Sequence, residues 1–193
     1  MKTIILITGY ARAGKDTLAE GITIGAKRLV AHINFADPLK QACDTYMQML
    51  EIGGSGSKRT FRNDAFKTAN RDFLVSAGTF ARSLDRDVFA LAFTRECRRT
   101  AKMHDEPNLT IVCSDWRYYN ELNIVRTVLG QDGWAIYTVI IKTAGCDAAC
   151  EEEGKSIGEI VREVPADLYY QFKPESKQEI IGEGKSLARQ LAL

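Results

Sequence analysis

The sequence has no long apolar run and no excess of one charge. Its strongest apolar stretches, residues 3–8 and 134–141, are far shorter than the roughly 20 residues that span a bilayer. The 26 Lys and Arg are balanced by 25 Asp and Glu, whereas a dedicated nucleic-acid binder usually carries a strongly basic face. We therefore expect neither a membrane protein nor a protein whose partner is nucleic acid.

Cysteine is also scarce, and the five cysteines are scattered. An odd, sparse set favours reduced thiols over a disulfide framework. The pair Cys146 and Cys150 has no second Cys or His pair beside it, which argues against a zinc site. Arg12 and Lys15 interrupt the first apolar run before it reaches the length of a signal peptide. These features predict a cytoplasmic protein.

The apolar segments that are present alternate between strand-like and helix-like patterns. The 193 residues suit a single domain. Such alternation predicts an α/β fold with a mostly parallel sheet flanked by helices on both faces. The expected strands are residues 3–8, 31–35, 109–114 and 134–142.

Helical patterns fill most of the intervening sequence. The sequence GGSGS at residues 53–57 predicts a mobile loop, and residues 143–163 predict a polar surface excursion. The expected helices are residues 16–28, 38–50, 120–129 and 176–191, with two or three more between 64 and 103, broken near Gly78 and Asp85.

The sequence GYARAGKDT directly follows the first predicted strand and precedes the first predicted helix. Backbone N–H groups of such a loop, together with the helix N-terminus, cradle a polyphosphate. Gly9 permits the sharp exit from the strand, Gly14 permits close approach of the phosphates, and Lys15 pairs with the β- and γ-phosphates. The predicted ATP-binding residues are Gly9, Ala11, Arg12, Ala13, Gly14, Lys15, Asp16 and Thr17.

One position departs from the usual phosphate-loop pattern. Asp16 stands directly after the lysine, where Ser or Thr normally binds Mg²⁺, and Thr17 follows it. A carboxylate is a good magnesium ligand, directly or through water. Both Asp16 and Thr17 are therefore candidate ligands for Mg²⁺.

Four segments in order resemble the bacteriophage-type deoxynucleoside monophosphate kinases. They are GKDT in the loop, FADPLK from Phe35, GTFAR from Gly78 and DWRYYNE from Asp115. The resemblance covers roughly residues 1–130, with a weaker likeness in the last helix. It implies a P-loop three-layer sandwich with a nucleoside-monophosphate-binding helical region at about 38–103 and a lid-like excursion at about 143–163.

The resemblance also implies the reaction, in which ATP and Mg²⁺ phosphorylate a deoxynucleoside 5′-monophosphate. The protein would then act in the host cytoplasm if a phage encodes it, and a homodimer remains open.

Acidic and basic residues follow the predicted strands at the sheet's carboxyl edge. Asp115 follows the strand 109–114 and is a candidate Mg²⁺ ligand, with capping of the next helix as the alternative. Arg117 is a candidate contact to the transferred phosphate, with a surface salt bridge as the alternative. In the resembled family the segment that holds Asp37 and Lys40 borders the acceptor, although Asp37 also suits a helix N-cap.

A second group of candidates lies in the helical region. Gly78 and Arg82 share a helical segment, and Arg86 lies one turn beyond Arg82, so both guanidiniums are expected on one face. Two such arginines suit a phosphate dianion, and Arg71 is a further candidate. The alternative is a solvated face. The predicted catalytic set is Lys15, Arg82, Asp115 and Arg117.

Two other functions remain open at this stage. One is a P-loop kinase for another small acceptor, such as dephospho-coenzyme A or phosphomevalonate. The other is a nucleotide-binding switch or ATPase, for which the near-zero net charge offers no support.

Overall fold

The computed structural model describes residues 1–52, 59–105 and 107–193. The loop predicted at residues 53–57 lies outside the described residues. The strands are β1 (Thr3–Thr8), β2 (Val30–His32), β3 (Thr110–Cys113), β4 (Ala135–Thr143) and β5 (Leu168–Phe172). The helices are α1 (Lys15–Gly25), α2 (Asp37–Met49), α3 (Asp64–Ala69), α4 (Arg71–Leu84), α5 (Val88–His104), α6 (Tyr119–Gln131), α7 (Glu151–Glu163) and α8 (Lys177–Gln190).

The strands form one sheet in the order β2-β3-β1-β4-β5, and every pairing is parallel. β1 lies at the centre, where Ile5 is in register with Val112 of β3 and Tyr137 of β4. All six residues of β1 are buried, as expected for a continuous apolar run in a parallel sheet. The α/β prediction is confirmed, with an all-parallel rather than mostly parallel sheet.

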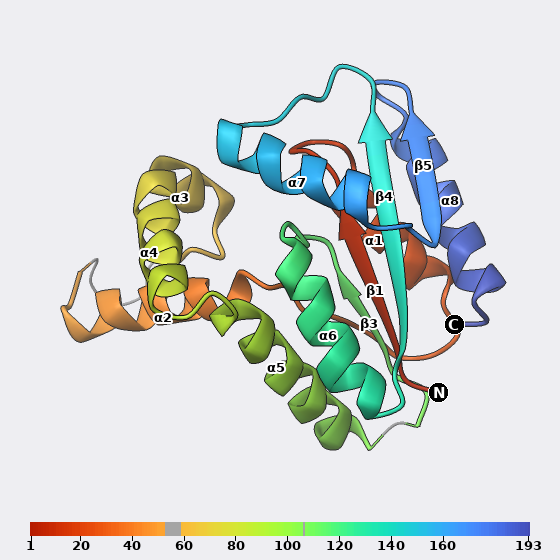
Figure 1. The fold of residues 1–193 in the computed structure, drawn as a ribbon, viewed down its shortest axis with the longest axis horizontal. Helices are drawn as coiled ribbons and strands as arrows, with labels where there is room; N and C mark the ends of the chain where they lie inside the picture. The colour runs from red at the N-terminus through yellow and green to blue at the C-terminus, as the bar shows by residue number, and fades with distance from the viewer. Residues whose placement is uncertain (53–58, 106) are drawn as a thin grey trace.

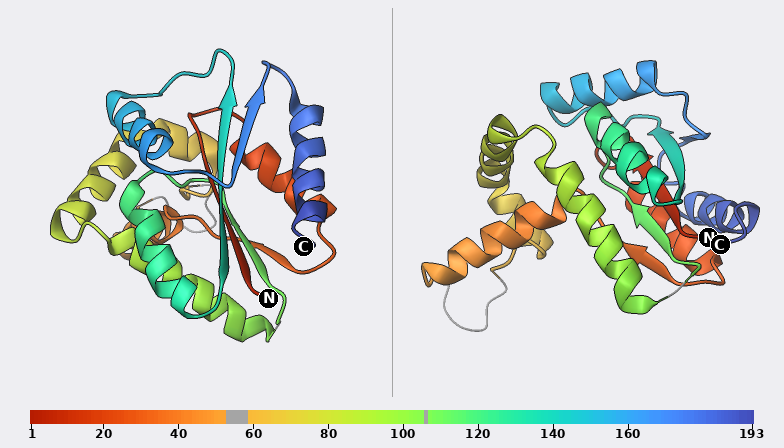
Figure 2. Two further views of the ribbon diagram at one scale, coloured as in Figure 1. Left: turned by 45° about the vertical axis from the view of Figure 1, so that its right-hand side comes forward. Right: turned by 60° about the horizontal axis from the view of Figure 1, so that its bottom comes forward.

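Helices cover both faces of this sheet and make a three-layer sandwich (Figures 1 and 2). Ile4 and Leu6 of β1 pack into one core with α5, α6 and the second half of α7. Ile5 and Ile7 pack into the other core with α1 and α8. Alternation along a single strand therefore supplies apolar side chains to both layers.

The direction of the chain connections reverses between β1 and β3, which makes this the topological switch point of the sheet. The connection from β1 leads past β3 to β2, whereas the connection from β3 leads past β1 to β4. In open parallel sheets ligands bind outside the carboxyl ends of the strands at such a switch point. The glycine-containing loop after β1 lies at this edge.

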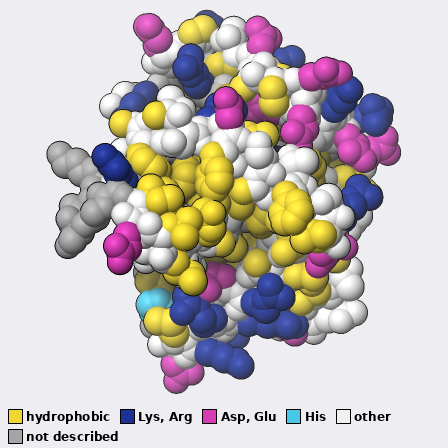
Figure 3. Space-filling view, turned by 90° about the vertical axis from the view of Figure 1, so that its left-hand side faces the viewer, with side chains coloured by type: hydrophobic (Ala, Val, Ile, Leu, Met, Phe, Trp, Pro, Cys, Tyr) yellow, Lys and Arg dark blue, Asp and Glu magenta, His cyan; other side chains and the backbone are white. Residues whose placement is uncertain are grey.

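Helices α2, α3 and α4 form a helical arm that stands away from the sheet (Figure 2, right). Its small core contains Cys43, Met47 and Phe61. Its outer surface exposes large apolar side chains, and Figure 3 shows hydrophobic side chains gathered on this face of the molecule. The exposed ones on the arm include Met49, Phe73, Phe80 and Leu84.

Two predictions for the arm are wrong. α4 runs unbroken through Gly78, because this glycine is buried where α4 packs on α2. A Cβ there would lie 3.2 Å from Leu39 Cδ2, so the residue serves close helix packing rather than a break. The helix end predicted near Asp85 is confirmed, since α4 ends at Leu84. Arg86 lies beyond that end, so the prediction that Arg82 and Arg86 share a helical face is wrong.

The largest differences lie in the C-terminal third. The predicted polar excursion at residues 143–163 contains α7, whose Ile157 and Ile160 are buried. Glycines and acidic residues within this helix weaken its apolar pattern in the sequence. Strand β5 was not expected, because it lies at the sheet edge and buries only Phe172 fully. β2 is also shorter than the predicted strand at 31–35.

Candidate functional site

The loop between β1 and α1 has the backbone geometry that its glycines predict. A Cβ at Gly9 would lie 2.3 Å from the carbonyl oxygen of Ile141, so only glycine allows β1 to end this close to β4. Gly14 has a φ of 93° and is the N-cap of α1, a left-handed conformation that glycine adopts without steric cost. The loop thereby places the N-terminus of α1 at the carboxyl edge of the sheet.

Lys15 is the first residue of α1 and folds back over this loop. Its Nζ donates hydrogen bonds of 2.7 Å to the carbonyl oxygens of Gly9 and Tyr10. Burial lowers the pKa of Lys15, and the nearby positive charge of Arg117 acts in the same direction, whereas Glu153 opposes it. The ammonium group is thus held at the loop, with further charged groups close to it.

Asp16, the next residue, is joined by a hydrogen bond to Ser114, which directly follows β3. Ser114 Oγ donates a 2.6 Å hydrogen bond to Asp16 Oδ1, and Ser114 N donates to Asn34 Oδ1 at 3.0 Å. Sequence reasoning missed Ser114 and Asn34 as site residues. The signal available for Ser114 was its position as the last residue of the strand predicted at 109–114.

Asp115 holds the chain segment ahead of α2 through hydrogen bonds to its backbone. Its Oδ1 accepts a 2.8 Å hydrogen bond from Phe35 N, and its Oδ2 accepts a 3.0 Å hydrogen bond from Ala36 N. The Sγ of Cys113 also donates to Oδ1 at 3.3 Å. Both carboxylate oxygens are therefore engaged, and this side chain ties β3 to the start of the helical arm.

Arg117 lies near Lys15 and is held through its backbone by a buried acid. The N–H groups of Arg117 and Tyr118 both donate to Glu121 Oε2 at 3.0 Å. Desolvation raises the pKa of Glu121 to about 8, against the effect of these hydrogen bonds. The Nη2 atom of Arg117 lies 3.6 Å from Oε1 of Glu153, a side chain only 1% exposed.

Arg82 on α4 reaches from the helical arm to Tyr118. Its guanidinium carbon lies 4.8 Å from the ring centroid of Phe89 and 4.4 Å from that of Tyr118. Two such cation–π contacts position the guanidinium without neutralising it. Arg82 is thus brought to the same segment as Arg117.

The other predicted acceptor residues are less directly connected to the loop. Lys40 forms a 3.2 Å ion pair with Oδ1 of Asp37, whose Oδ2 accepts a hydrogen bond from Asn34 N. Arg71 and Arg86 are exposed, at the start of α4 and after its end. Among the described residues, neither side chain is joined to the loop after β1 by a hydrogen bond or ion pair.

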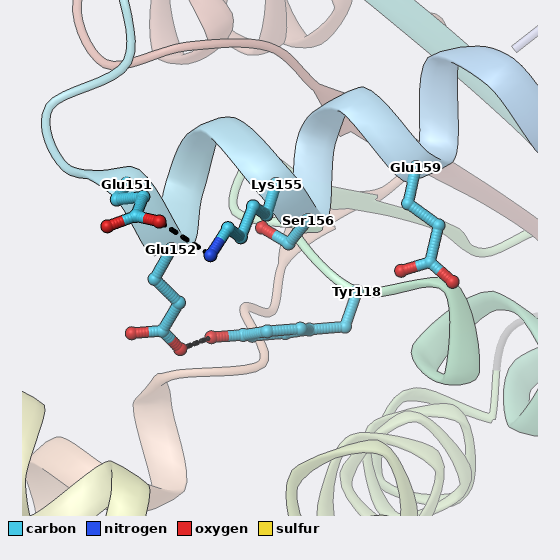
Figure 4. Close-up of a pocket in the computed structure, with 6 residues that line it drawn as sticks. All are labelled: Tyr118, Glu151, Glu152, Lys155, Ser156 and Glu159. Carbon is cyan, nitrogen blue, oxygen red and sulfur yellow. Dashed lines mark hydrogen bonds and ion pairs between the residues drawn. The ribbon is translucent and has the colours of Figure 1, made fainter.

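A cavity of about 440 Å³ lies between Tyr118 and α7 (Figure 4). Tyr118 Oη donates a 2.5 Å hydrogen bond to Glu152, and Lys155 pairs with Glu151 at 2.5 Å. The volume is within the range of small-molecule sites, roughly 300–1,000 Å³. Only the tertiary structure reveals this cavity, which is lined by Tyr118, Glu151, Glu152, Lys155, Ser156 and Glu159.

In the described part of the chain, no group of three or more His, Cys, Asp or Glu side chains could hold a metal ion. A magnesium ion at Asp16 would therefore take most of its ligands from phosphate oxygens and water, as Mg²⁺ commonly does. None of the described helices combines the length and the apolar character needed to cross a membrane.

Fold and loop together define an α/β protein of the P-loop-like three-layer sandwich type. No protein-family model matches the chain, and no curated protein matches it. Among solved structures it is similar to an unliganded sugar kinase from Janibacter sp. HTCC2649, with 9% identity and a TM-score of 0.44. That match covers 100% of this chain and 97% of the kinase. A likeness at this level identifies neither a family nor a reaction.

Proposed function

We propose that this protein is a P-loop kinase that transfers the γ-phosphoryl group of ATP to a deoxynucleoside 5′-monophosphate. The observation that carries the proposal is the loop at residues 9–14, which lies at the switch point of a parallel sheet and is followed by Lys15, the first residue of α1. A free helix N-terminus and an adjacent ammonium group are suited to a polyphosphate. The family resemblance supplies the acceptor class.

The residues around Asp16 fit a magnesium ion. Asp16 is exposed, and the Ser114 hydrogen bond engages only its Oδ1, so the other oxygen remains for a metal or a metal-bound water. Thr17, one residue on, is the second candidate. Both oxygens of Asp115 already accept backbone hydrogen bonds, whereas the Ser114 hydrogen bond engages one oxygen of Asp16, so we assign the primary metal role to Asp16. Bound Mg²⁺ would offset charge on the phosphates.

The acceptor is proposed to lie beside the 115–118 segment, in reach of both the helical arm and the cavity between Tyr118 and α7. Arg82 presents a positioned guanidinium, and Lys40 offers an ammonium group whose partner, Asp37, is half exposed. The cavity beside Tyr118 has room for the nucleoside part of an acceptor. Near-zero net charge supports a small-molecule acceptor over nucleic acid.

Phosphoryl transfer needs no covalent bond between the protein and the substrate, because catalysis depends mainly on positioning the reactants and neutralising charge. Lys15 and Arg117 would hold the transferring phosphate, while Arg82 holds the acceptor. This division explains why the site needs no nucleophilic Ser or Cys.

The test is a coupled assay of ADP release with ATP and Mg²⁺, adding dAMP, dGMP, dCMP, dTMP and a 5-hydroxymethyl pyrimidine monophosphate separately. We expect at least one of them to stimulate ADP formation, and Lys15→Ala to reduce that rate by roughly a hundredfold or more. Lys27→Ala is the matched control, since Lys27 is exposed just beyond α1. It should keep the parent rate.

Other outcomes would refute the proposal in different ways. Stimulation only by dephospho-coenzyme A or phosphomevalonate would keep the kinase and change the acceptor. ADP release that nucleic acid stimulates without any monophosphate would indicate a nucleotide-dependent switch or ATPase.

A further inference from the structure

Glu153 is a buried carboxylate near the loop that we propose binds phosphate. It lies in a segment that the sequence predicted to be a polar excursion and that the structure shows to be helical. α7 carries it, and α7 lies in front of the end of β1 in Figure 1. Glu153 Oε2 accepts a 2.7 Å hydrogen bond from Ala149 N. Its Oε1 is buried and has no hydrogen-bond partner among the described residues.

The surroundings of Oε1 are cationic. Arg117 Nη2 lies 3.6 Å away, a distance for ion pairing rather than a hydrogen bond. Glu153 also raises the pKa of Lys15, which places its charge within electrostatic reach of the lysine of the loop. A buried carboxylate is costly to desolvate, and here two nearby cations add to the hydrogen bond from Ala149 N in offsetting that cost.

A nucleotide at the loop would compete with Glu153 for the same cations. Its phosphates carry several negative charges and need Lys15 and Arg117 as counter-ions. Like charges within a few ångströms repel each other, and the repulsion is stronger for a buried carboxylate such as Glu153, which is 1% exposed, than for one in bulk water. The carboxylate therefore weakens the binding of phosphates against Arg117, and the phosphates weaken its pairing with Arg117.

We propose that Glu153 is an internal counter-ion that nucleotide phosphates displace. In the nucleotide-free protein it holds Arg117 and keeps the first turns of α7 over the loop. Nucleotide binding breaks this pair and frees Arg117 to contact phosphate, which moves the start of α7. The inference rests on the proposed function only in requiring that ATP bind at residues 9–17.

The experiment measures the dissociation constant of MgATP by isothermal titration calorimetry for Glu153→Gln and for the parent protein. Gln retains an oxygen for Ala149 N and removes only the charge, so the fold should persist, which a thermal melt verifies. We expect ATP to bind roughly tenfold more tightly to Glu153→Gln. Glu163→Gln is the matched control, because Glu163 is on the same helix, does not line the cavity beside Tyr118, and its side chain is 51% exposed. Its affinity should stay within about twofold.

A double-mutant cycle assigns the effect to Arg117. In an Arg117→Ala background, the gain from Glu153→Gln should fall to about twofold or less, because the competing pair is already absent. Hydrogen exchange supplies a readout of motion: in the parent protein, MgATP should accelerate exchange at amides 151–156.

Equal or weaker ATP binding by Glu153→Gln would overturn the proposal, as would an undiminished gain in the Arg117→Ala background. Failure of ATP to bind either protein would overturn it together with the kinase. If the expected changes in affinity occur but no deoxynucleoside monophosphate stimulates ADP release, only the proposed acceptor fails. If ADP release is stimulated but Glu153→Gln leaves affinity unchanged, only the counter-ion role fails.

Discussion

Glu121 is a buried acid whose side chain accepts hydrogen bonds from the backbone of the segment that carries Arg117. Its raised pKa can be tested quantitatively through the pH dependence of protein stability. Desolvation raises its pKa to about 8, from an ordinary value of 4.5. Below pH 4.5 the side chain is protonated in both states. As pH rises from there to about 8, the unfolded chain releases the proton while the folded protein retains it. Stability is therefore lost across this window.

These pKa values set the size of the effect. The pKa of Glu121 is 4.5 in the unfolded chain and about 8 in the folded protein. Its contribution to the free energy of unfolding therefore falls by about 2–3 kcal/mol between pH 6 and pH 9. Glu121→Gln keeps an acceptor for the N–H groups of Arg117 and Tyr118 but cannot ionise. We expect this variant to gain that amount relative to the parent protein over the same pH range.

The assay is thermal unfolding of both proteins at pH 6, 7, 8 and 9. The difference in melting temperature should shift by roughly 5–10 °C in favour of Glu121→Gln as pH rises. Glu20→Gln, at an exposed position of α1, should instead follow the parent protein. Parallel pH profiles for the parent and Glu121→Gln would refute the assignment of a raised pKa to this acid.

Two further substitutions test packing and the carboxyl edge of the sheet. Gly21→Ala would place a Cβ 2.5 Å from the carbonyl oxygen of Ile181, where α1 packs on α8. We expect the free energy of unfolding, measured with urea, to fall by about 2–4 kcal/mol. A fall below about 0.5 kcal/mol would contradict that packing. Asp115→Asn turns an NH₂ group towards the N–H of Phe35 or Ala36, so without Mg²⁺ we expect about 1–3 kcal/mol of destabilisation. An unchanged melting temperature, with weakened binding of MgATP, would instead favour the predicted metal role of Asp115.

The local sequence was enough to predict the central elements. The run at residues 3–8 is apolar and β-branched throughout, and a strand buried on both faces is the structure that accommodates it. The spacing of Gly9, Gly14 and Lys15 likewise determines a turn between strand and helix, since those φ values and close approaches require glycine. These features depend on neighbours within a few residues, which the sequence displays directly.

Weakly patterned elements were not predictable in the same way. α7 combines a polar, glycine-containing sequence with only a few buried apolar side chains. β5 alternates exposed and partly buried residues at the sheet edge. Their structure is stabilised by packing against the rest of the fold, so their own sequences carry little signal.

The partners of the charged residues were decided by tertiary structure alone. Ser114 reaches Asp16, and Asp115 holds the backbone of Phe35, because the sheet order places the ends of β1, β2 and β3 at one edge. Arg117 faces Glu153 because α7 returns to that same edge after β4. These partners are separated by 36 to 98 residues of chain, so the sequence around a carboxylate does not specify which cation or hydrogen-bond donor it will contact. The strand order and the packing of the helices determine those contacts.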